Sequence, residues 1–233
     1  MKKTSLVLLT FFAAIEVAAC PLCNKEINNA IYNSTFYPNL FIILSPFIVL
    51  ALIVAALVVI TNKRHNNWVT ANPNVKVLSP VPLTTASVII GIGFGGFVDG
   101  ILLHQILQVH EMLSNKIAAT NYTGKSVNMF WDGIFHAFCF FSAVTGVVQL
   151  WKLMLRNDVD RSGNLFVAGL MFGWGTFNLV EGLMDHQILK LHNVIEFAQD
   201  HATGNYIFLS TSVVMSVIGW LLVRRAHRKS YRS

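Results

Sequence analysis

The chain has 233 residues, of which 54% are hydrophobic and only 12% are charged, and its mean hydropathy is +0.57. A chain of this size and composition is too apolar for a soluble globular protein, so the composition predicts an integral membrane protein. The formal net charge is +6, but the basic residues fall between the apolar segments, so the charge is no argument for nucleic-acid binding.

The first nineteen residues have the pattern of a secretory signal peptide. Lys2 and Lys3 precede an apolar run from Leu6 to Ile15, and small residues follow directly before Cys20. Residues 1–19 are therefore expected to be removed from the mature protein. The alternatives are an uncleaved membrane anchor and a lipoprotein signal, in which Cys20 would be acylated.

Residues 20–75 are predicted to form an external segment followed by an anchor helix. Cys20 and Cys23 are separated by two residues, which is the spacing of thiol redox and soft-metal motifs. Outside the cytoplasm such a pair forms a short disulfide unless a metal uses the thiolates. The apolar stretch that follows, from about residue 39 to 61, has no ionisable side chain and is long enough to cross a bilayer.

Residues 76–233 contain four more apolar segments of membrane-spanning length, at about 83–108, 129–153, 164–189 and 205–223. If the five spans alternate in direction, most basic residues fall on one side, among them Lys63, Arg64, Lys152, Arg156 and Arg224. The other side holds Lys25, Lys116, Lys125 and Lys190. The positive-inside rule makes the first side cytoplasmic. We therefore predict an all-α, multi-pass protein of the bacterial inner membrane, with an anchor helix, a four-helix core and a cytoplasmic carboxyl terminus.

One heptapeptide pattern occurs twice, from His104 to His110 and again, 82 residues later, from His186 to His192. An acid and a glycine precede each copy at the same offsets, as Asp99-Gly100 and Glu181-Gly182. Such self-similarity predicts an internal repeat in which the second and fourth spans are equivalent, parallel helices. Histidines and carboxylates are rare in membrane helices, so their recurrence at one depth indicates a site rather than packing.

Glycines line both of these spans. Gly91 and Gly95 in the second span, and Gly169 and Gly173 in the fourth, resemble the small-residue stripes that let membrane helices approach closely. We expect the two spans to pack directly against each other and so to share ligands.

The histidines of three spans are predicted to meet near the external face. On a straight α-helix, His104 and His110 would lie about 120° apart around the axis and about 9 Å apart along it, so one metal ion could not easily take both. His136, about one turn inside the third span, falls at nearly the depth of His104 and His186. The predicted metal ligands are therefore His104, His136 and His186.

The acidic side chains and the remaining histidines are expected to form the surroundings of this metal or a second site. Asp132 lies one helical turn before His136 and could orient an imidazole. Glu181, Asp185 and His192 share one stripe of the fourth span. Taken singly, each polar group could also serve only as a hydrogen bond between helices. The wider set is Asp132, Asp99, Glu181, Asp185, His110 and His192.

Three motifs resemble the bacterial predicted membrane proteins catalogued as domain of unknown function 2243; they run from Gly93 to Gln105, from Asp132 to His136 and from Gly175 to Gln187. The resemblance covers about residues 83–225 and brings no established activity. Such proteins can accompany cytochrome oxidase assembly factors, so the resemblance implies a link to copper. The segment with Cys20 and Cys23 lies outside it and resembles short membrane proteins that begin with Cys-Pro-x-Cys, so the chain would join two modules.

The sequence thus predicts a membrane protein with a histidine-rich metal site near the external face. Copper handling, or a copper redox centre linked to respiratory oxidase assembly, is the leading hypothesis, because thiolates select Cu(I) and imidazole accepts both oxidation states. One alternative is a zinc-dependent intramembrane hydrolase, in which three histidines leave an open position for water. Another is haem held between helices by His104 and His186.

The expected partners are the lipid bilayer and other membrane or metallochaperone proteins, and no nucleic acid is expected. Whether the protein is an enzyme stays open.

Overall fold

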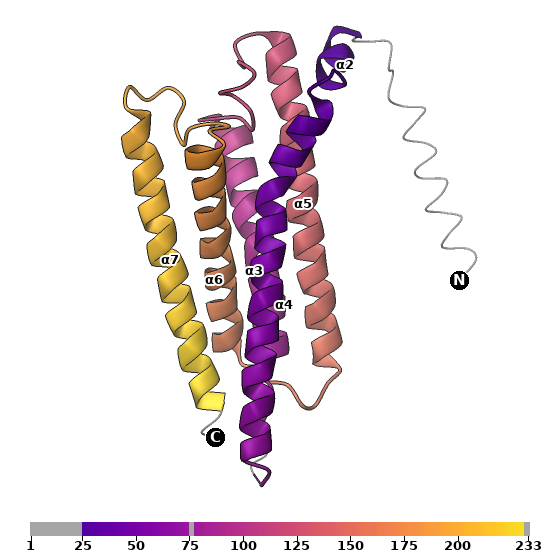
Figure 1. Ribbon diagram of the computed structural model, residues 1–233, viewed down its shortest axis with the longest axis vertical. Helices are drawn as coiled ribbons and strands as arrows, with labels where there is room; N and C mark the ends of the chain where they lie inside the picture. Colours follow the sequence, from indigo (N-terminus) through magenta and orange to yellow (C-terminus); the bar gives the residue numbers. More distant parts are fainter. Residues whose placement is uncertain (1–24, 75–76, 231–233) are drawn as a thin grey trace, which may run out of the picture.

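The computed structural model describes residues 25–74 and 77–230, and the described chain is a bundle of long helices joined by short connections (Figure 1). The predicted signal peptide over residues 1–19 and the thiol pair Cys20 and Cys23 lie outside the described residues. The helical elements are α2 (Lys25–Ile31), α3 (Phe36–Ala71), α4 (Val81–Phe97), η1 (Val98–Ile106), α5 (Tyr122–Met154), α6 (Gly163–Glu181), η2 (Gly182–Ile188) and α7 (His201–Ser230). The elements η1 and η2 are π-helices that continue α4 and α6.

Five of the described helices are long and apolar enough to cross a membrane, which confirms the predicted all-helical class and the prediction of five segments of spanning length. They extend over Phe36–Ala71, Val81–Ile106, Tyr122–Met154, Gly163–Ile188 and His201–Lys229. Most begin or end several residues beyond the predicted limits. Hydropathy marks the part of a helix that can lie in hydrocarbon, whereas the hydrogen-bonded helix continues through polar residues into the interface.

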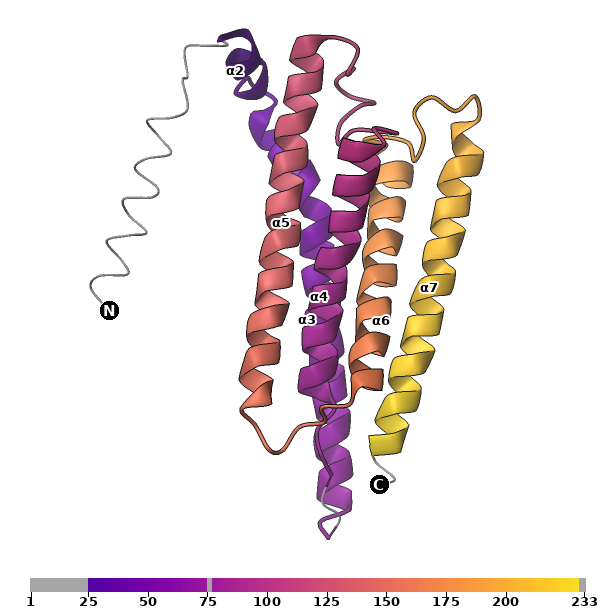
Figure 2. The ribbon, with the colours of Figure 1, turned by 180° about the vertical axis from the view of Figure 1, so that it is seen from behind.

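The helices that carry the histidines lie at the centre of the bundle. α4 packs extensively against both α5 and α6, and α7 packs against α6 on the far side from α4 (Figure 2). α3 makes smaller contacts with α4, α5 and α6. The second and fourth spans are therefore direct neighbours, as the glycine stripes predict.

Glycines at the contact between α4 and α6 make this close approach possible. A Cβ atom at Gly91 would lie 3.0 Å from the Cα of Leu170, and a Cβ atom at Gly173 would lie 2.9 Å from the Cα of Val88. In both cases the obstacle is the backbone of the opposite helix, which cannot rotate away. The two backbones can therefore touch because one residue at each contact has no side chain.

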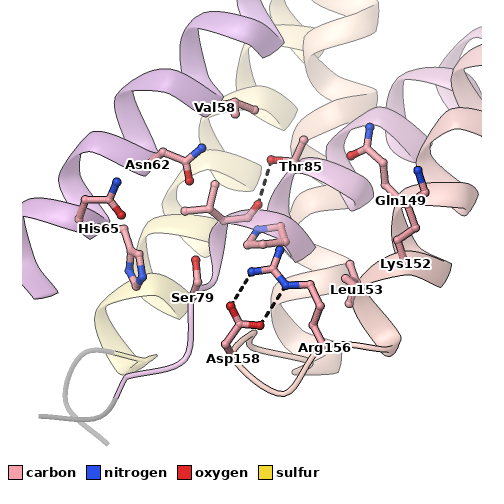
Figure 3. Close-up of a pocket in the computed structure, with 13 residues that line it drawn as sticks. Val58, Asn62, His65, Ser79, Thr85, Gln149, Lys152, Leu153, Arg156 and Asp158 are labelled. Carbon is pink, nitrogen blue, oxygen red and sulfur yellow. Dashed lines mark hydrogen bonds and ion pairs between the residues drawn. The ribbon is translucent and has the colours of Figure 1, made fainter.

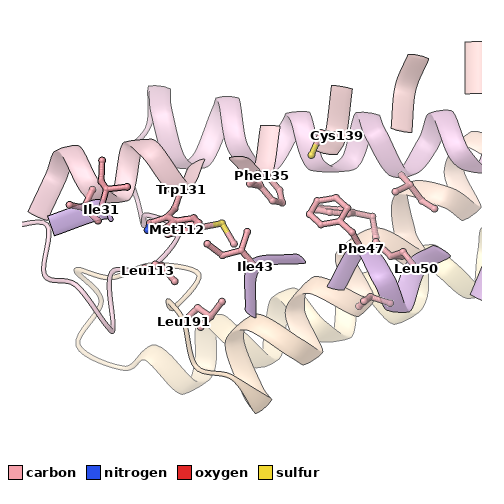
Figure 4. Close-up of a cluster of buried hydrophobic side chains, with 14 of the residues drawn as sticks. Ile31, Ile43, Phe47, Leu50, Met112, Leu113, Trp131, Phe135, Cys139 and Leu191 are labelled. Atoms are coloured by element: carbon pink, nitrogen blue, oxygen red, sulfur yellow. The ribbon is translucent and has the colours of Figure 1, made fainter. Parts of the chain in front are cut away.

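A cluster of buried apolar side chains fills the bundle beside the histidines (Figure 4). Trp131 and Phe135 come from α5, whereas Met112 and Leu191 come from the segments that follow η1 and η2. All four are at most 2% exposed. This packing holds the two connecting segments against the helix ends and keeps solvent away from the polar groups beneath them.

The opposite end of the bundle is polar and basic. A cavity of about 480 Å³ opens there among residues of α3, α5 and the connections next to them, including Asn62, Lys152 and Arg156 (Figure 3). Arg156 pairs with Asp158 through Nε and Nη2, at 3.0 and 2.5 Å, and this hydrogen bonding lowers the pKa of the Asp158 carboxyl group. The pair is exposed, so it contributes little to stability. The cavity contains none of the predicted metal ligands.

Candidate metal centre

The two helices that carry the repeated heptapeptide both change from α-helix to π-helix where the acidic residues lie. Asp99 is the second residue of η1, and Glu181 directly precedes η2. His104 and His186 lie inside these π-helical turns. A π-turn accommodates an additional residue between hydrogen-bonded groups, and such turns occur mostly as short interruptions at functional sites. The change therefore displaces each histidine from the position that a regular α-helix would give it.

Directly after η1 the chain reverses instead of continuing as a helix. The Leu107 N–H donates to the Leu102 carbonyl at 2.8 Å, and the Val109 N–H donates to the Leu103 carbonyl at 3.0 Å. Between them Gln108 has a φ of 50°, a left-handed conformation that is uncommon for residues other than glycine. His110 therefore folds back toward the helix end that it has just left.

The end of η2 has the same backbone geometry. The Leu189 N–H donates to the Met184 carbonyl and the Leu191 N–H to the Asp185 carbonyl, both at 2.7 Å, and Lys190 has a φ of 50°. His192 is thereby brought to a ring-centroid distance of 4.8 Å from His186.

These reversals change the relation between the two histidines of each heptapeptide. The ring centroids of His104 and His110 lie 4.4 Å apart, whereas a straight helix would separate the residues by about 9 Å. The heptapeptide is not one continuous helix, because hydrogen-bonded helix ends at Ile106 and at Ile188. Both histidines of a copy can therefore serve one site, contrary to the expectation from helical spacing.

The two returning histidines hold each other's segments by reciprocal hydrogen bonds. His110 Nδ1 donates to the Val194 carbonyl at 2.9 Å, and His192 Nδ1 donates to the Met112 carbonyl at 3.1 Å. Their rings are parallel within 3°, with centroids 4.6 Å apart. Because a carbonyl oxygen only accepts, both Nδ1 atoms carry the proton, and in the neutral imidazoles both Nε2 atoms present a lone pair. Burial lowers the pKa of His192 to about 4, which favours that neutral form.

His104 is fixed in the same tautomer by an acidic residue. Its Nδ1 donates to Asp132 Oδ1 at 2.8 Å, and the same oxygen accepts the Met112 N–H at 3.1 Å. Phe135 stacks on the imidazole, with ring centroids 5.9 Å apart and planes within 5° of parallel. A carboxylate that receives the distal N–H of an imidazole is the usual support of a metal-binding histidine.

Asp99 lies against the open nitrogens of its own heptapeptide. Its Oδ2 is 3.1 Å from His104 Nε2, and its Oδ1 is 3.7 Å from His110 Nε2. Neither Nε2 atom makes a hydrogen bond of acceptable geometry among the described residues. A lone pair that faces a carboxylate oxygen requires a cation between them, either a proton or a metal ion.

Glu181 has the corresponding position in the second copy. Its Oε1 is 2.7 Å from His186 Nε2 and 3.3 Å from His192 Nε2. Its other oxygen, Oε2, is buried and has no hydrogen-bond partner among the described residues. The carboxylate therefore has acceptor capacity left for a cation.

Two groups of buried side chains could each hold a metal ion. His104, His110 and His192 present ligand atoms that all lie within 4.8 Å of one another, and so do Glu181, His186 and His192. Each of these residues is at most 4% exposed. Imidazole and carboxylate are the donors that zinc, copper and iron use in proteins.

His136 lies beside these groups and is not one of their members. It is half-buried, and its ring stacks on Phe97 with centroids 6.4 Å apart. Its imidazole also lies over the backbone of η1, since a Cβ atom at Gly100 would be 2.9 Å from His136 Cδ2. The structure thus brings His104 together with His110 and His192, and the Asp132 carboxylate accepts its hydrogen bond from His104.

Four carboxyl groups are buried around the histidines and form no ion pair with a lysine or arginine among the described residues. Asp99, Asp132, Glu181 and Asp185 are 5%, 2%, 2% and 1% exposed. Among the described residues, no lysine or arginine forms an ion pair with any of them; Lys125 of α5 pairs with Glu111 instead. Buried charges are costly unless they are paired or bind a metal, so this region needs positive charge.

A model of a family of predicted membrane proteins, described as Predicted membrane protein (DUF2243), matches residues 86–226. The match extends from α4 to the last turns of α7 and includes every residue of the two groups that could hold a metal ion. No curated protein and no solved structure matches the chain.

Proposed function

The chain belongs to the DUF2243 family of predicted membrane proteins, and we propose that it works by binding a transition metal at the buried histidine site. One observation carries this proposal. Ligand atoms of His104, His110 and His192 lie within 4.8 Å of one another, and in each ring Nδ1 donates a hydrogen bond to an oxygen. The Nε2 atoms of these rings face buried carboxylates, Asp99 for His104 and His110 and Glu181 for His192, so a cation bound there would have both imidazole and carboxylate ligands. This arrangement is that of a metal-binding histidine with its supporting acceptor.

We propose copper as the metal and copper handling, or a copper redox centre linked to respiratory oxidase assembly, as the role. Imidazole binds copper in both oxidation states, and the nearby carboxylates suit the harder Cu(II) ion. The thiol pair Cys20 and Cys23, outside the described residues, would bring copper to or from the site. Metallochaperones and other membrane proteins would be the partners in that transfer.

The burial of the site favours this role over zinc-dependent hydrolysis. Among the described residues the candidate ligands are at most 4% exposed and lie beside the apolar cluster that includes Trp131, Phe135 and Met112. A hydrolase needs its metal-bound water next to the substrate bond. Electron transfer needs no such access, because electrons can cross packed side chains.

The local packing also weighs against haem. An axial histidine must face the iron with an open side, yet His104 Nε2 is in contact with Asp99, and His186 Nε2 is in contact with Glu181. The second histidine of each copy lies within 5 Å of the first. A porphyrin ring would have to displace these groups.

We further propose that α4 with η1 and α6 with η2 are the two halves of an internal repeat, and that the site lies at the external face. The repeat would explain why both helices end in a π-turn and a left-handed residue. The orientation is supported by charge, because Lys152, Arg156 and Arg224 lie at the end of the bundle opposite the histidines.

The proposal is tested by the metal content of the protein purified in detergent without chelators. Cells would be grown with copper, zinc, iron and manganese, and metals would be measured by mass spectrometry on wild type and on His104→Ala. The matched control is His201→Ala, which removes an exposed histidine at the same end of the bundle. We expect copper in wild type and in the control, and its loss in His104→Ala.

Protein without stoichiometric metal would overturn the proposed function and leave the histidines as structural hydrogen-bonding groups. Zinc in place of copper would overturn the copper assignment and favour the hydrolase. An intense Soret band in the absorption spectrum would favour haem.

A further inference from the structure

We infer that the site holds two metal ions side by side, one at Asp99, His104 and His110 and the other at Glu181, His186 and His192. The inference rests on the proposed metal binding and adds the number of ions, the ligands of each and their proximity. Each ion would have two imidazoles and one carboxylate from this chain. These three side chains would supply only part of the ligands of each ion.

The first set is assembled within one helix end. Asp99 Oδ2 lies 3.1 Å from His104 Nε2, and Asp99 Oδ1 lies 3.7 Å from His110 Nε2. Both Nε2 atoms are buried and without a hydrogen bond among the described residues. A metal ion bound between them would use every one of these ligand atoms.

The second set has the same composition and chain order. Glu181 Oε1 lies 2.7 Å from His186 Nε2 and 3.3 Å from His192 Nε2, and the three residues form a complete ligand group. Glu181 Oε2 and His186 Nε2 are buried, and neither makes a hydrogen bond among the described residues. A single ion at His104, His110 and His192 would leave Glu181 Oε2 without a partner among the described residues.

His192 places the two sets next to each other. Its Nε2 lies within 4.8 Å of the ligand atoms of His104 and His110, although it also belongs to the group of Glu181 and His186. Its ring is stacked on that of His110, with centroids 4.6 Å apart. His192 cannot bridge two ions through both nitrogens, because Nδ1 donates to the Met112 carbonyl. The two proposed ions would therefore be neighbours at this end of the bundle.

Charge balance also favours two ions. Asp99, Asp132, Glu181 and Asp185 are buried together, and among the described residues no lysine or arginine neutralises them. A divalent ion bound at Asp99 and another at Glu181 would each offset the charge of a buried carboxylate, which lowers the cost of burying that charge in a low-dielectric region.

The test counts ions. Detergent-purified protein would be stripped with a chelator, reloaded with a copper(II) salt and freed of excess metal, and copper per chain would be measured. Wild type is expected to bind two ions, whereas His110→Ala and His186→Ala, each of which damages one set, are expected to bind one. His201→Ala is the control that should keep both. Electron paramagnetic resonance should show a weak or absent signal for the coupled pair and an ordinary Cu(II) signal in the variants.

The outcomes separate this inference from the proposed function. One ion per wild-type chain, with a full Cu(II) signal, would overturn the pair while leaving metal binding intact. No bound ion would overturn both. If circular dichroism shows that His110→Ala or His186→Ala does not fold, Asp99→Asn replaces the first and Glu181→Gln the second. The number of copper ions per wild-type chain by itself still decides between one ion and two.

Discussion

At the scale of single residues, the site is defined by which nitrogen of each imidazole is engaged. Asp132 accepts the Nδ1–H of His104, and backbone carbonyls accept those of His110 and His192. These acceptors set both the tautomer and the direction of the free nitrogen. The carbonyls belong to the backbone, so Asp132 is the one support of this kind that a side-chain substitution can remove.

Replacing Asp132 by asparagine is expected to weaken metal binding about 10- to 100-fold, as for other groups that orient a metal-binding histidine. The amide can keep the hydrogen bond from His104 but loses the negative charge. Metal affinity would be measured by competition with a chelator of known affinity. Asp158→Asn, at the exposed opposite end of the bundle, is the control. Equal affinities in Asp132→Asn and wild type would remove Asp132 from the site.

At the scale of elements, two helix ends and one helix contact create the site. Each π-turn and the left-handed residue after it return a histidine to the end of its own helix, at Gln108 and at Lys190. Strained backbone of this kind persists only where surrounding structure holds it, and here the reciprocal bonds of His110 and His192 do so. The glycines between α4 and α6 then bring the two ends within reach of each other.

The helix contact is tested by Gly91→Ala, with Gly133→Ala as its matched control. A Cβ atom at Gly91 would meet the Leu170 backbone, whereas one at Gly133 would meet nothing within 4 Å. We expect Gly91→Ala to reduce stability by about 1–3 kcal/mol through overpacking and to reduce metal content as well. Gly133→Ala should be neutral or slightly stabilising, because alanine is the better helix former. Thermal unfolding in detergent measures both. Equal losses in the two variants would show that the contact between α4 and α6 is not the cause.

At the scale of the whole molecule, the two ends of the bundle differ in chemistry. One end carries the buried histidines and carboxylates under an apolar cover, and the other carries a cavity lined by Lys152 and Arg156. The separation would allow the proposed metal site to face one compartment while the basic end remains in the other.

Reporter fusions test the proposed orientation. Green fluorescent protein fused after Ser233 should fluoresce, and alkaline phosphatase fused there should be inactive, because the carboxyl terminus is expected in the cytoplasm. Alkaline phosphatase fused after Thr120, between η1 and α5, should be active. The reverse pattern would place the histidines at the cytoplasmic face and contradict the proposed topology.

The sequence alone predicted a membrane protein, five segments of membrane-spanning length and the residue types of the candidate site. These features depend on local composition and on the histidine spacing that occurs twice in the chain. Both can be recognised in the sequence without knowing which distant segments are in contact. The glycine spacing likewise predicted that α4 and α6 are neighbours, because only glycine permits such close backbone contact.

Only the tertiary structure decided which histidines come together. Six residues of straight helix would separate His104 from His110, and no glycine or proline at Gln108 signals the reversal that joins them. The reversal is held by the Val194 carbonyl, which is 84 positions from His110 in the chain and therefore leaves no local signal in the sequence. The end of a helix is a local feature, but here the direction of the chain after the helix is fixed by a hydrogen bond to a residue in the other half of the molecule.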